Sequence, residues 1–390
     1  MSKYHFDEYV ERRGTGCVKY DEAPHADVIP LWVADMDFRA APAIQEAVCR
    51  RAAHGVYGYT VVTDEYYAAV INWFSRRHQW NIYREEMLYT TGVVPAMSVA
   101  IKALTMPGEK VLILSPDYNC FFSSIRNNGC EVLETALKKD GENRFAVQWE
   151  DFEAKCADEK TTVFLLCNPH NPTGRVWTAD ELARMNDICL RHHVKVVSDE
   201  IHCELIMPGH RFQPFAAVSE ACRMNSVVLN SPSKSFNIAG LQTANIICAQ
   251  PDWLRRLERA ININEVCDLN PFGPVALQAA YNDSEDWIDE LNEYLWENYQ
   301  ALCHYFAEHQ PQLVVTPLEG TYLVWVDVSA CGIPVEQLCD RWLNEAHVWV
   351  NPGTMYGPET GRGYVRINIA CPRARLMEGL ERMNALLRQE

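Results

Sequence analysis

The sequence predicts an α/β protein with a large domain on a mainly parallel, doubly wound sheet and a smaller α+β domain. Apolar or β-branched runs of four to seven residues alternate with helical stretches between about residues 86 and 250. Each run is nearly continuous in apolar character, as expected for strands buried on both faces. The length of 390 residues suits one large and one small domain. The expected strands are Lys110–Leu114, Thr161–Cys167, Val194–Ser198, Ser226–Leu229 and Ala244–Cys248.

The segments between these runs have helical features. Thr178 and Glu181 have the spacing of a capping box at a helix start. Leu182, Met185 and Ile188 follow at helical spacing. A helix between two strands acts as a right-handed crossover, so the alternation predicts parallel strand pairing.

The pattern changes towards the C-terminus. Residues 284–310 are predicted to form one long helix with an apolar face, followed by Pro311. Tyr322–Val328 and Gly363–Asn368 are expected to be extended, with a helix near Val335–Glu345 between them. The first 40 residues lack a clear sheet signal. We therefore expect an N-terminal arm (1–45) packed with the small domain, a large domain (46–284) and a C-terminal small domain (285–390).

The net charge of the chain limits the classes of partner that we expect. There are 35 Lys and Arg residues against 52 Asp and Glu residues, so the formal net charge is −17. Nucleic acids and anionic membranes reward excess positive charge, so neither is an expected partner. A small-molecule substrate remains compatible with this charge, because a local basic pocket can still hold a small anion.

The cysteines and the apolar runs indicate the cellular compartment in which the protein is expected. Fifteen cysteines are scattered singly, with no C-x-x-C pair, which favours reduced, buried thiols over a disulfide framework. The longest apolar runs are far shorter than a membrane span, and Met1–Glu8 has no signal-like apolar run. We therefore expect a cytoplasmic protein.

Polar residues follow three of the predicted strands. The turn Asn168–Gly174 contains two Asn-Pro pairs, Asp199–His202 reads Asp-Glu-Ile-His, and Asn230–Ser235 contains a lysine among serines. Upstream, Thr91–Pro95 opens a helical stretch whose free N–H groups suit a phosphate. Open α/β sheets bind ligands at the carboxyl ends of their strands, so these pieces are expected to converge.

Each piece alone is more often a turn, a helix cap or a solvated loop lysine. Together they supply an amine, a carboxylate, an amide and a phosphate nest at neighbouring strand ends. Those groups are what a pyridoxal phosphate site requires, because the cofactor needs a lysine, a partner for its ring nitrogen and donors for its phosphate.

Three motifs, at Asn168–Gly174, Ser198–His202 and Ser231–Phe236, resemble the class I/II aminotransferase superfamily of pyridoxal-phosphate enzymes, fold type I. Within it the sequence is similar to the branch of cystathionine β-lyases and related C–S lyases (the MalY/PatB type). The similarity extends nearly end to end through further segments, at Ala34–Phe38, His54–Tyr59, Ser115–Tyr118 and Tyr364–Arg373.

The resemblance implies roles for the residues around the cofactor ring. Lys234 would form the Schiff base and act as the catalytic base. Asp199 would partner the pyridine nitrogen, and Asn171 would donate to the ring oxygen O3′. Tyr118 would stack on the ring and take part in catalysis, and His202 would also lie against the cofactor.

The resemblance also implies how the phosphate is held. Tyr59 would reach the phosphate of the neighbouring subunit's cofactor, because these enzymes resemble homodimers with shared active sites. The cradle within the subunit would come from the backbone of Val93 and Val94, with Ser231 and Ser233.

For the substrate, the resemblance makes Arg366 a bidentate clamp on the α-carboxylate, with Asn171 and Tyr59 nearby. No metal is expected. Two positions depart from the aminotransferase pattern: Gln242 stands where many relatives have an arginine that pairs with the phosphate, and His202 stands where they often have tyrosine. The histidine resembles the C–S lyase branch.

The implied reaction is β-elimination at a β-thio amino acid, giving pyruvate, ammonia and a thiol such as homocysteine. Lys234 would remove the Cα proton and could protonate the leaving sulfur. The runner-up is an aminotransferase, which shares the early steps. The substrate side chain is expected near Asp35–Phe38, Tyr57, Tyr118 and Tyr322.

Three other readings stay open. Ser231–Lys234 also matches the S-x-x-K motif of serine acyl enzymes, but its S-D-N and K-T-G companions do not occur. A metal hydrolase could use Asp199, Glu200, His202 and Glu204, although the run lacks H-E-x-x-H spacing. The third is a non-catalytic protein that binds pyridoxal phosphate or a partner.

Overall fold

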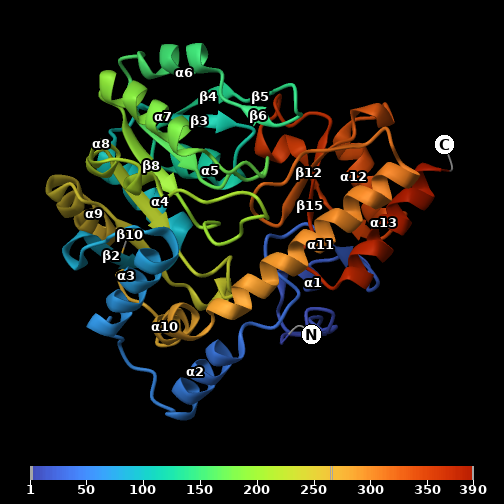
Figure 1. The fold of residues 1–390 in the computed structure, drawn as a ribbon, viewed down its shortest axis with the longest axis horizontal. Coiled ribbons are helices and arrows are strands. Elements are labelled where there is room, and N and C mark those ends of the chain that lie inside the picture. Colours follow the sequence, from blue (N-terminus) through green and yellow to red (C-terminus); the bar gives the residue numbers. More distant parts are fainter. Residues whose placement is uncertain (1–2, 264, 266, 389–390) are drawn as a thin grey trace.

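The computed structural model describes residues 3–263, 265 and 267–388. Its centre is a seven-stranded sheet with the order β2-β10-β9-β8-β7-β3-β4, in which only β10 runs antiparallel to its neighbours (Figure 1). The strands are β2 (Met87–Thr90), β3 (Lys110–Ser115), β4 (Glu131–Ala136), β7 (Thr161–Cys167), β8 (Lys195–Asp199), β9 (Ser226–Asn230) and β10 (Ala244–Ile247). The predicted α/β class is confirmed.

Helices cover both faces of the large sheet, so it is doubly wound, and side chains that alternate along each strand pack against both layers. On β7, Val163 and Leu165 pack into one apolar cluster, and Phe164 and Leu166 pack into another. The first cluster is completed by α4 (Val93–Leu104), α5 (Asn119–Asn127) and α9 (Pro251–Ile263). The second is completed by α6 (Trp149–Cys156), α7 (Ala179–Arg191) and α8 (Glu220–Met224).

Two strands of the large sheet were not predicted. They are β2 and β4, which form its edges. β4 carries Glu131 and Glu134 and lacks the continuous apolar run of a central strand, and β2 has only four residues, of which the middle two are half-buried. The direction of β10 also has a local cause. The connection 231–243 contains only a short 3-10 turn, η3 (Ala239–Leu241), and without a crossover helix the next strand returns antiparallel.

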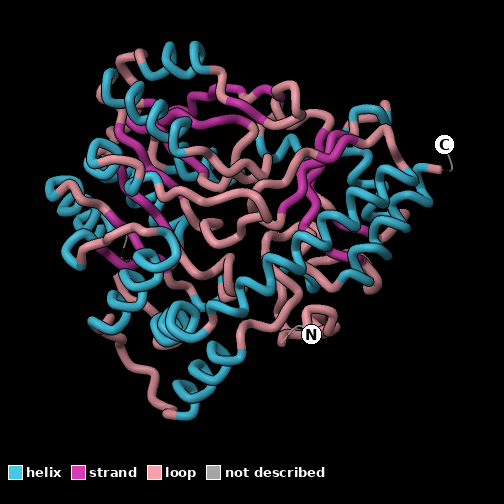
Figure 2. The backbone as a smooth tube through the Cα atoms, in the orientation of Figure 1, coloured by secondary structure: helices cyan, strands magenta, loops and turns pink. Residues whose placement is uncertain are grey.

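A separate four-stranded sheet lies to the right of the large one (Figure 2). It is antiparallel, with the order β11 (Val314–Val315), β12 (Leu323–Asp327), β15 (Tyr364–Asn368), β14 (Asn351–Pro352). Three helices accompany it, namely α11 (Glu285–His309), α12 (Val335–Asn344) and α13 (Arg373–Leu387). The predicted long helix, the two extended pieces and the helix between them are confirmed, with no end shifted by more than one residue.

The N-terminal arm lies against this small domain (Figure 1). After α1 (Val18–Asp21), β1 (Ile29–Pro30) pairs in parallel with β13 (Val348–Trp349). The ring of Trp32 stacks on that of Trp349, with centroids 4.0 Å apart. The domain limits predicted at residues 45 and 284 stay a prediction.

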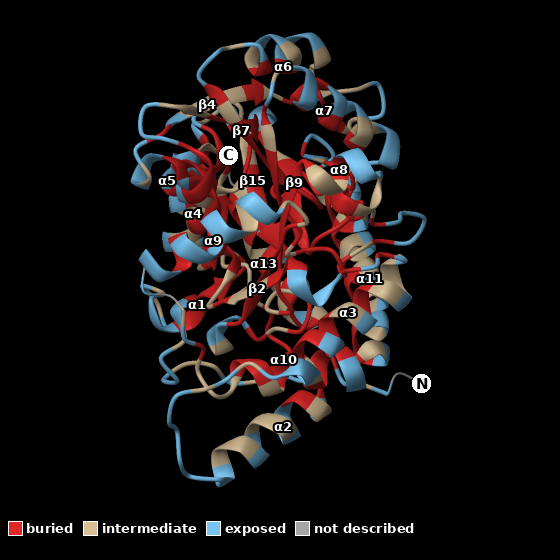
Figure 3. Ribbon diagram, turned by 90° about the vertical axis from the view of Figure 1, so that its left-hand side faces the viewer, coloured by how far each residue is buried: buried red, intermediate tan, exposed pale blue. Residues whose placement is uncertain are grey.

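The remaining helices pack beside the large sheet. α2 (Pro42–Ala53) and α3 (Asp64–His78) both contact α10 (Gly273–Asp283). α2 projects at one end of the molecule, and the segment between α2 and α3 is largely exposed (Figure 3). The capping box predicted at Thr178 and Glu181 is present at the start of α7.

The smallest elements are a strand pair and four further 3-10 turns. They are β5 (Lys138–Lys139), β6 (Phe145–Ala146), η1 (Arg84–Glu86), η2 (Phe215–Ala217), η4 (Ser329–Cys331) and η5 (Gly353–Tyr356). Across the described part of the chain, no helix has both the length and the apolar character that crossing a bilayer requires.

Candidate active site

A cavity of about 210 Å³ lies at the carboxyl edge of the large sheet, where open α/β sheets bind their ligands. It is lined by the start of α4, the residue before α5, the last residues of β7 and β8, and the chain that follows β7, β8 and β9 as far as η3. Ala34 of the N-terminal arm also lines it. Eight of the eleven predicted site residues line it, namely Val93, Val94, Tyr118, Asn171, Asp199, His202, Ser233 and Lys234. The convergence expected from the strand ends is therefore observed.

Asp199, the last residue of β8, is buried in this cavity wall. Its Oδ1 accepts a hydrogen bond of 3.1 Å from the N–H of Ile201. Burial raises the pKa of Asp199 to about 7, because the charged form loses its hydration. A positive or N–H-bearing group placed in the cavity would favour the ionised carboxylate.

Lys234 enters the cavity from the turn after β9. Its Nζ donates a 2.6 Å hydrogen bond to the backbone carbonyl of Ala34 in the N-terminal arm. Burial lowers the pKa of the amine, and the nearby charge of Arg366 lowers it further, while Asp35 opposes both. A lysine with a lowered pKa is closer to the neutral state in which it can act as nucleophile or base.

Arg366, on the other sheet, contacts the cavity wall through Asn171. It lies on β15, is only 3% exposed, and donates from Nη1 to Oδ1 of Asn171 at 3.1 Å. Nη2 donates to the carbonyl of Trp32 at 2.8 Å, and the guanidinium lies over the ring of Tyr356, 4.7 Å from its centroid. Arg366 does not itself line the cavity. Its contact orients the Asn171 amide, whose Nδ2 has no hydrogen-bond partner among the described residues.

His202 is a neutral imidazole in the cavity wall. Burial, reinforced by the charges of Lys234 and Arg366, lowers its pKa to about 3. Its ring contacts Tyr322 edge to face, with centroids 6.1 Å apart, and its buried Nδ1 has no partner among the described residues. A buried nitrogen without a partner is costly, so this atom is suited to a ligand or an ordered water.

The start of α4 supplies the expected anion cradle. The helix begins at Val93, Gly92 gives no side-chain cap, and both line the cavity with Val94. The first N–H groups of a helix have no intrahelical acceptor and favour negative charge.

The two predicted serines differ in position. Ser233 lines the cavity, whereas Ser231 does not. The Ser231 hydroxyl donates to the carbonyl of Thr243 at 2.7 Å and accepts from the N–H of Ser233 at 3.0 Å. In this structure Ser231 therefore shapes the turn that carries Ser233 and Lys234.

The two predicted tyrosines also lie apart. Tyr118 precedes α5 and lines the cavity, where burial raises its pKa well above the ordinary range. Tyr59 is fully exposed on the segment between α2 and α3 and lies outside the cavity of its own chain.

Sequence reasoning missed the part played by the arm. The carbonyl of Ala34 accepts hydrogen bonds from both Lys234 Nζ and the hydroxyl of Tyr322, the latter at 3.0 Å. Ala34–Phe38 was recognised as a family segment, but a backbone acceptor leaves no mark in side-chain patterns. Of the other expected pocket residues, Tyr57 is exposed and its hydroxyl bonds to the carbonyl of Ala52.

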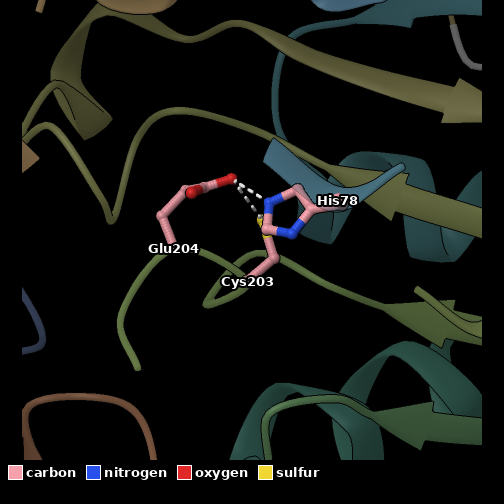
Figure 4. Close-up of side chains that lie close together, drawn as sticks. All are labelled: His78, Cys203 and Glu204. Atoms are coloured by element: carbon pink, nitrogen blue, oxygen red, sulfur yellow. Dashed lines mark hydrogen bonds and ion pairs between the residues drawn. The ribbon is translucent and has the colours of Figure 1, made fainter. Parts of the chain in front are cut away.

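The four residues considered for a metal hydrolase do not form one site. Asp199 and His202 line the cavity, but Glu204 lies in a different cluster, with His78 and Cys203, whose ligand atoms are all within 4.8 Å (Figure 4). Glu204 Oε1 is 2.6 Å from His78 Nε2 and accepts from Trp73 Nε1 at 2.7 Å.

The rest of this cluster also disfavours metal binding. Glu204 Oε2 pairs with Arg77 at 3.2 Å, so both carboxylate oxygens already have partners. Burial raises the pKa of the Cys203 thiol, which opposes the thiolate that a metal would need. We interpret the cluster as an ion-pair network that ties α3 to the chain after β8.

These features, an amine and a carboxylate at adjacent strand ends with a helix start beside them, occur in a sequence that matches a known family. The profile described as "Aminotransferase class I and II" matches residues 26–383. The chain belongs to this family.

Full-length relatives narrow its place in the family. Cystathionine β-lyase PatB of Bacillus subtilis (strain 168) is 40% identical, covering 98% of this chain and 99% of that protein. Protein MalY of Escherichia coli (strain K12) is 35% identical, covering 97% of each. These matches place the chain in the branch of cystathionine β-lyases and C–S lyases.

A solved structure agrees in fold. Cystalysin from Treponema denticola, whose crystal structure contains pyridoxal 5′-phosphate, superposes with a TM-score of 0.95 at 32% identity, covering 99% of each chain. This likeness confirms the predicted fold type. Gln242, where the resemblance implies an arginine in many relatives, is exposed and does not line the cavity.

Proposed function

We propose that the protein is a pyridoxal-phosphate-dependent C–S lyase. It carries out β-elimination on an amino acid with sulfur on Cβ, giving pyruvate, ammonia and a thiol such as homocysteine. The observation that carries this proposal is the meeting of Lys234 and Asp199 in one cavity, in a chain 40% identical to a cystathionine β-lyase.

The cavity fits the cofactor on its own chemistry. Asp199 offers a buried carboxylate to the ring nitrogen, and the free Nδ2 of Asn171 offers a donor to a ring oxygen. The start of α4 offers N–H groups to the phosphate. The unpartnered Nδ1 of His202 gains a possible partner when the cavity is filled.

Bound pyridoxal phosphate would supply an electron-withdrawing ring that makes the substrate Cα–H bond acidic. Lys234 would accept the Cα proton, because burial favours its neutral amine. As the Cβ–S bond breaks and the thiolate leaves with the electron pair, Nζ returns a proton to the sulfur. Water then completes the release of ammonia and pyruvate.

Arg366 would hold the substrate α-carboxylate. It is a buried cation on the small sheet, joined to the cofactor side of the site through Asn171. A planar guanidinium pairs with a carboxylate through two parallel hydrogen bonds, which fixes the orientation of the bond to be broken.

We also propose a homodimer in which Tyr59 reaches the site of the partner. The segment between α2 and α3 exposes Val56 (64%), Tyr57 (55%), Tyr59 (100%) and Val61 (78%). Apolar side chains gathered on one exposed segment are typical of an interface. Sedimentation equilibrium should give a dimer, and Tyr59→Ala should weaken cofactor retention without unfolding the chain. A monomer with full activity would contradict this part.

The unpaired cysteines bear on compartment. None of the fifteen cysteines forms a disulfide in the structure, which supports a reducing compartment, and we place the protein in the cytoplasm.

The decisive test of the function measures two products. The purified holo-protein should be yellow, and it should release thiol and pyruvate in equal amounts from cystathionine. Steady exchange of amino groups between an amino acid and a keto acid, without thiol release, would favour the aminotransferase. A protein that binds no pyridoxal phosphate would favour a partner-binding role.

A further inference from the structure

The arm segment Leu31–Phe38 crosses between the two sheets and contributes Ala34 to the wall of the cavity. It contains no helix and no strand. Its backbone carbonyls are bound by side chains that come from both domains. Backbone hydrogen bonds hold it at Leu31 and at Asp37, whose N–H donates to the carbonyl of Ala370 at 2.9 Å, and between these points it takes its position from the side-chain contacts.

On the small-sheet side, Asn368 binds the backbone on both sides of Ala34. Its Nδ2 donates to the carbonyl of Val33 at 2.5 Å and to that of Asp35 at 2.7 Å. Its Oδ1 accepts from the N–H of Ala370 at 2.8 Å, which fixes the orientation of the amide. Asn368 is 1% exposed, so these bonds do not compete with bulk water.

On the large-domain side, Asn237 binds the next part of the segment. Its Nδ2 donates to the carbonyls of Met36 at 3.0 Å and Phe38 at 2.8 Å, and its Oδ1 accepts from the N–H of Met36 at 3.0 Å. Asn237 follows Lys234 by three residues in the same turn. Its φ of 55° is in the left-handed region, which asparagine tolerates better than most residues.

The atom of the segment that binds Lys234 is the backbone carbonyl oxygen of Ala34. The carbonyl of Ala34 accepts from Lys234 Nζ at 2.6 Å and from the Tyr322 hydroxyl at 3.0 Å. Displacing Ala34 would remove the acceptor that fixes the amine.

Ion pairs hold the segment by its side chains. Arg12 contacts Asp35 at 2.6 Å and Asp37 at 2.7 Å, and Lys19 lies 3.1 Å from Asp37. The same two cations also bind the backbone, since Arg12 Nη1 donates to the carbonyl of Met36 at 3.0 Å and Lys19 Nζ to that of Asp35 at 3.2 Å. Arg12 and Lys19 belong to the arm itself, whereas the two asparagines bind its carbonyls from the small and the large domain.

We propose that Asn237 and Asn368 are positioning residues for Lys234. They hold the arm from opposite domains so that the Ala34 carbonyl binds one N–H of the amine and leaves its lone pair directed into the cavity. The arm thereby joins the domain that binds the substrate carboxylate to the lysine that moves the proton. This inference rests on the proposed function for its kinetic consequence only.

The first measurement is independent of catalysis. Hydrogen exchange in the cofactor-free protein should speed up at least about tenfold in peptides covering residues 33–38 when Asn237 or Asn368 is changed to alanine, because each loses its backbone contacts. Asn344→Ala, an exposed asparagine on α12, is the control and should change nothing there. Unchanged exchange in both variants would overturn the proposal.

The second measurement separates positioning from loosening of the fold. Each alanine variant should lower kcat about 10- to 100-fold with KM within about threefold, and the double variant should cost little more than either single one, because both act through Ala34. Faster exchange with unchanged kcat, or fully additive losses, would show a purely structural role.

A second pair of variants covers the case in which an alanine variant does not fold. If an alanine variant does not fold, the Asn→Asp variant replaces it, since it keeps the Oδ acceptor for Met36 or Ala370 and loses only the donated bonds. A wild-type protein that releases no thiol would refute the proposed function while leaving the exchange result to decide whether the asparagines hold the arm.

Discussion

The two sheets contribute to the site in different ways. The large sheet presents its polar groups from the carboxyl ends of its strands and from the loops that follow. Asp199 is the last residue of β8, and Lys234 lies in the turn after β9. The small sheet presents Arg366 and Asn368 from within a strand, where alternate residues face the arm. The cofactor side is therefore built from local chain order. The substrate side depends on a segment more than 300 residues away, since Arg366 binds the carbonyl of Trp32.

The largest effect should come from the large-sheet side. Lys234→Ala removes the amine proposed to carry the proton, and we expect kcat to fall at least about 10²–10⁴-fold. Pyruvate release measures it, and Lys138→Ala, an exposed lysine on β5, serves as the control. A Lys234→Ala protein with more than a tenth of the activity would contradict the assignment of the base.

The next effect tests the carboxylate at the end of β8. Asp199→Asn keeps the shape of the side chain but removes the charge that would pair with the ring nitrogen. We expect kcat to fall about 10²-fold or more, because breaking a buried charge pair costs ~3–5 kcal/mol. The matched control is Glu200→Gln, at the neighbouring residue, whose carboxylate bonds to Phe215 N–H and the Ser198 hydroxyl. Equal losses in the two variants would mean that Asp199 has no special role.

A smaller effect should mark the small-sheet side. Arg366→Ala should raise KM about 10- to 100-fold while the visible absorption of the bound cofactor persists, because the lost interaction is with the substrate carboxylate. Arg362→Ala, just before the same strand and largely exposed, should leave KM unchanged. If Arg366→Ala instead released the cofactor, the assignment of cofactor binding to the large sheet and substrate binding to the small sheet would be wrong.

The smallest effect concerns stability and pH. Burial raises the pKa of Glu200 from 4.5 to about 8. As pH rises from about 4.5, the unfolded chain releases this proton while the folded chain keeps it, so the free energy of unfolding falls until about pH 8 and then levels. Glu200→Gln cannot titrate and so does not lose stability in this way. In the cofactor-free protein, the melting temperature of the variant should therefore rise relative to that of the wild type between pH 5 and pH 8.5. A constant difference would contradict the raised pKa.

Much of the large domain could be predicted because its signals are local. Central strands such as Thr161–Cys167 are continuous apolar runs, and the motifs after them stand out by composition. The edge strands β2 and β4 were missed, since an edge strand is only partly buried and its sequence need not be apolar.

Ser231 shows where residue type was insufficient. Ser231 was assigned to the phosphate from the resemblance, yet its hydroxyl is engaged by Thr243 and Ser233. Tyr59 was assigned to the cofactor of the partner subunit, and its position outside the cavity of its own chain is compatible with that role, which stays a prediction. Motifs identify which side chains are near a site, but hydrogen-bond competition decides which of them face it.

By itself, the sequence determined the fold class, the family resemblance and the order of polar groups along the strand ends, because strand burial and turn chemistry depend on neighbours in the chain. Only the tertiary structure decided how the arm enters the site. The acceptor for Lys234 is the backbone carbonyl of Ala34, fixed by Asn237 and Asn368 from two domains. Every residue carries such a carbonyl, so only the fold determines which one meets the amine.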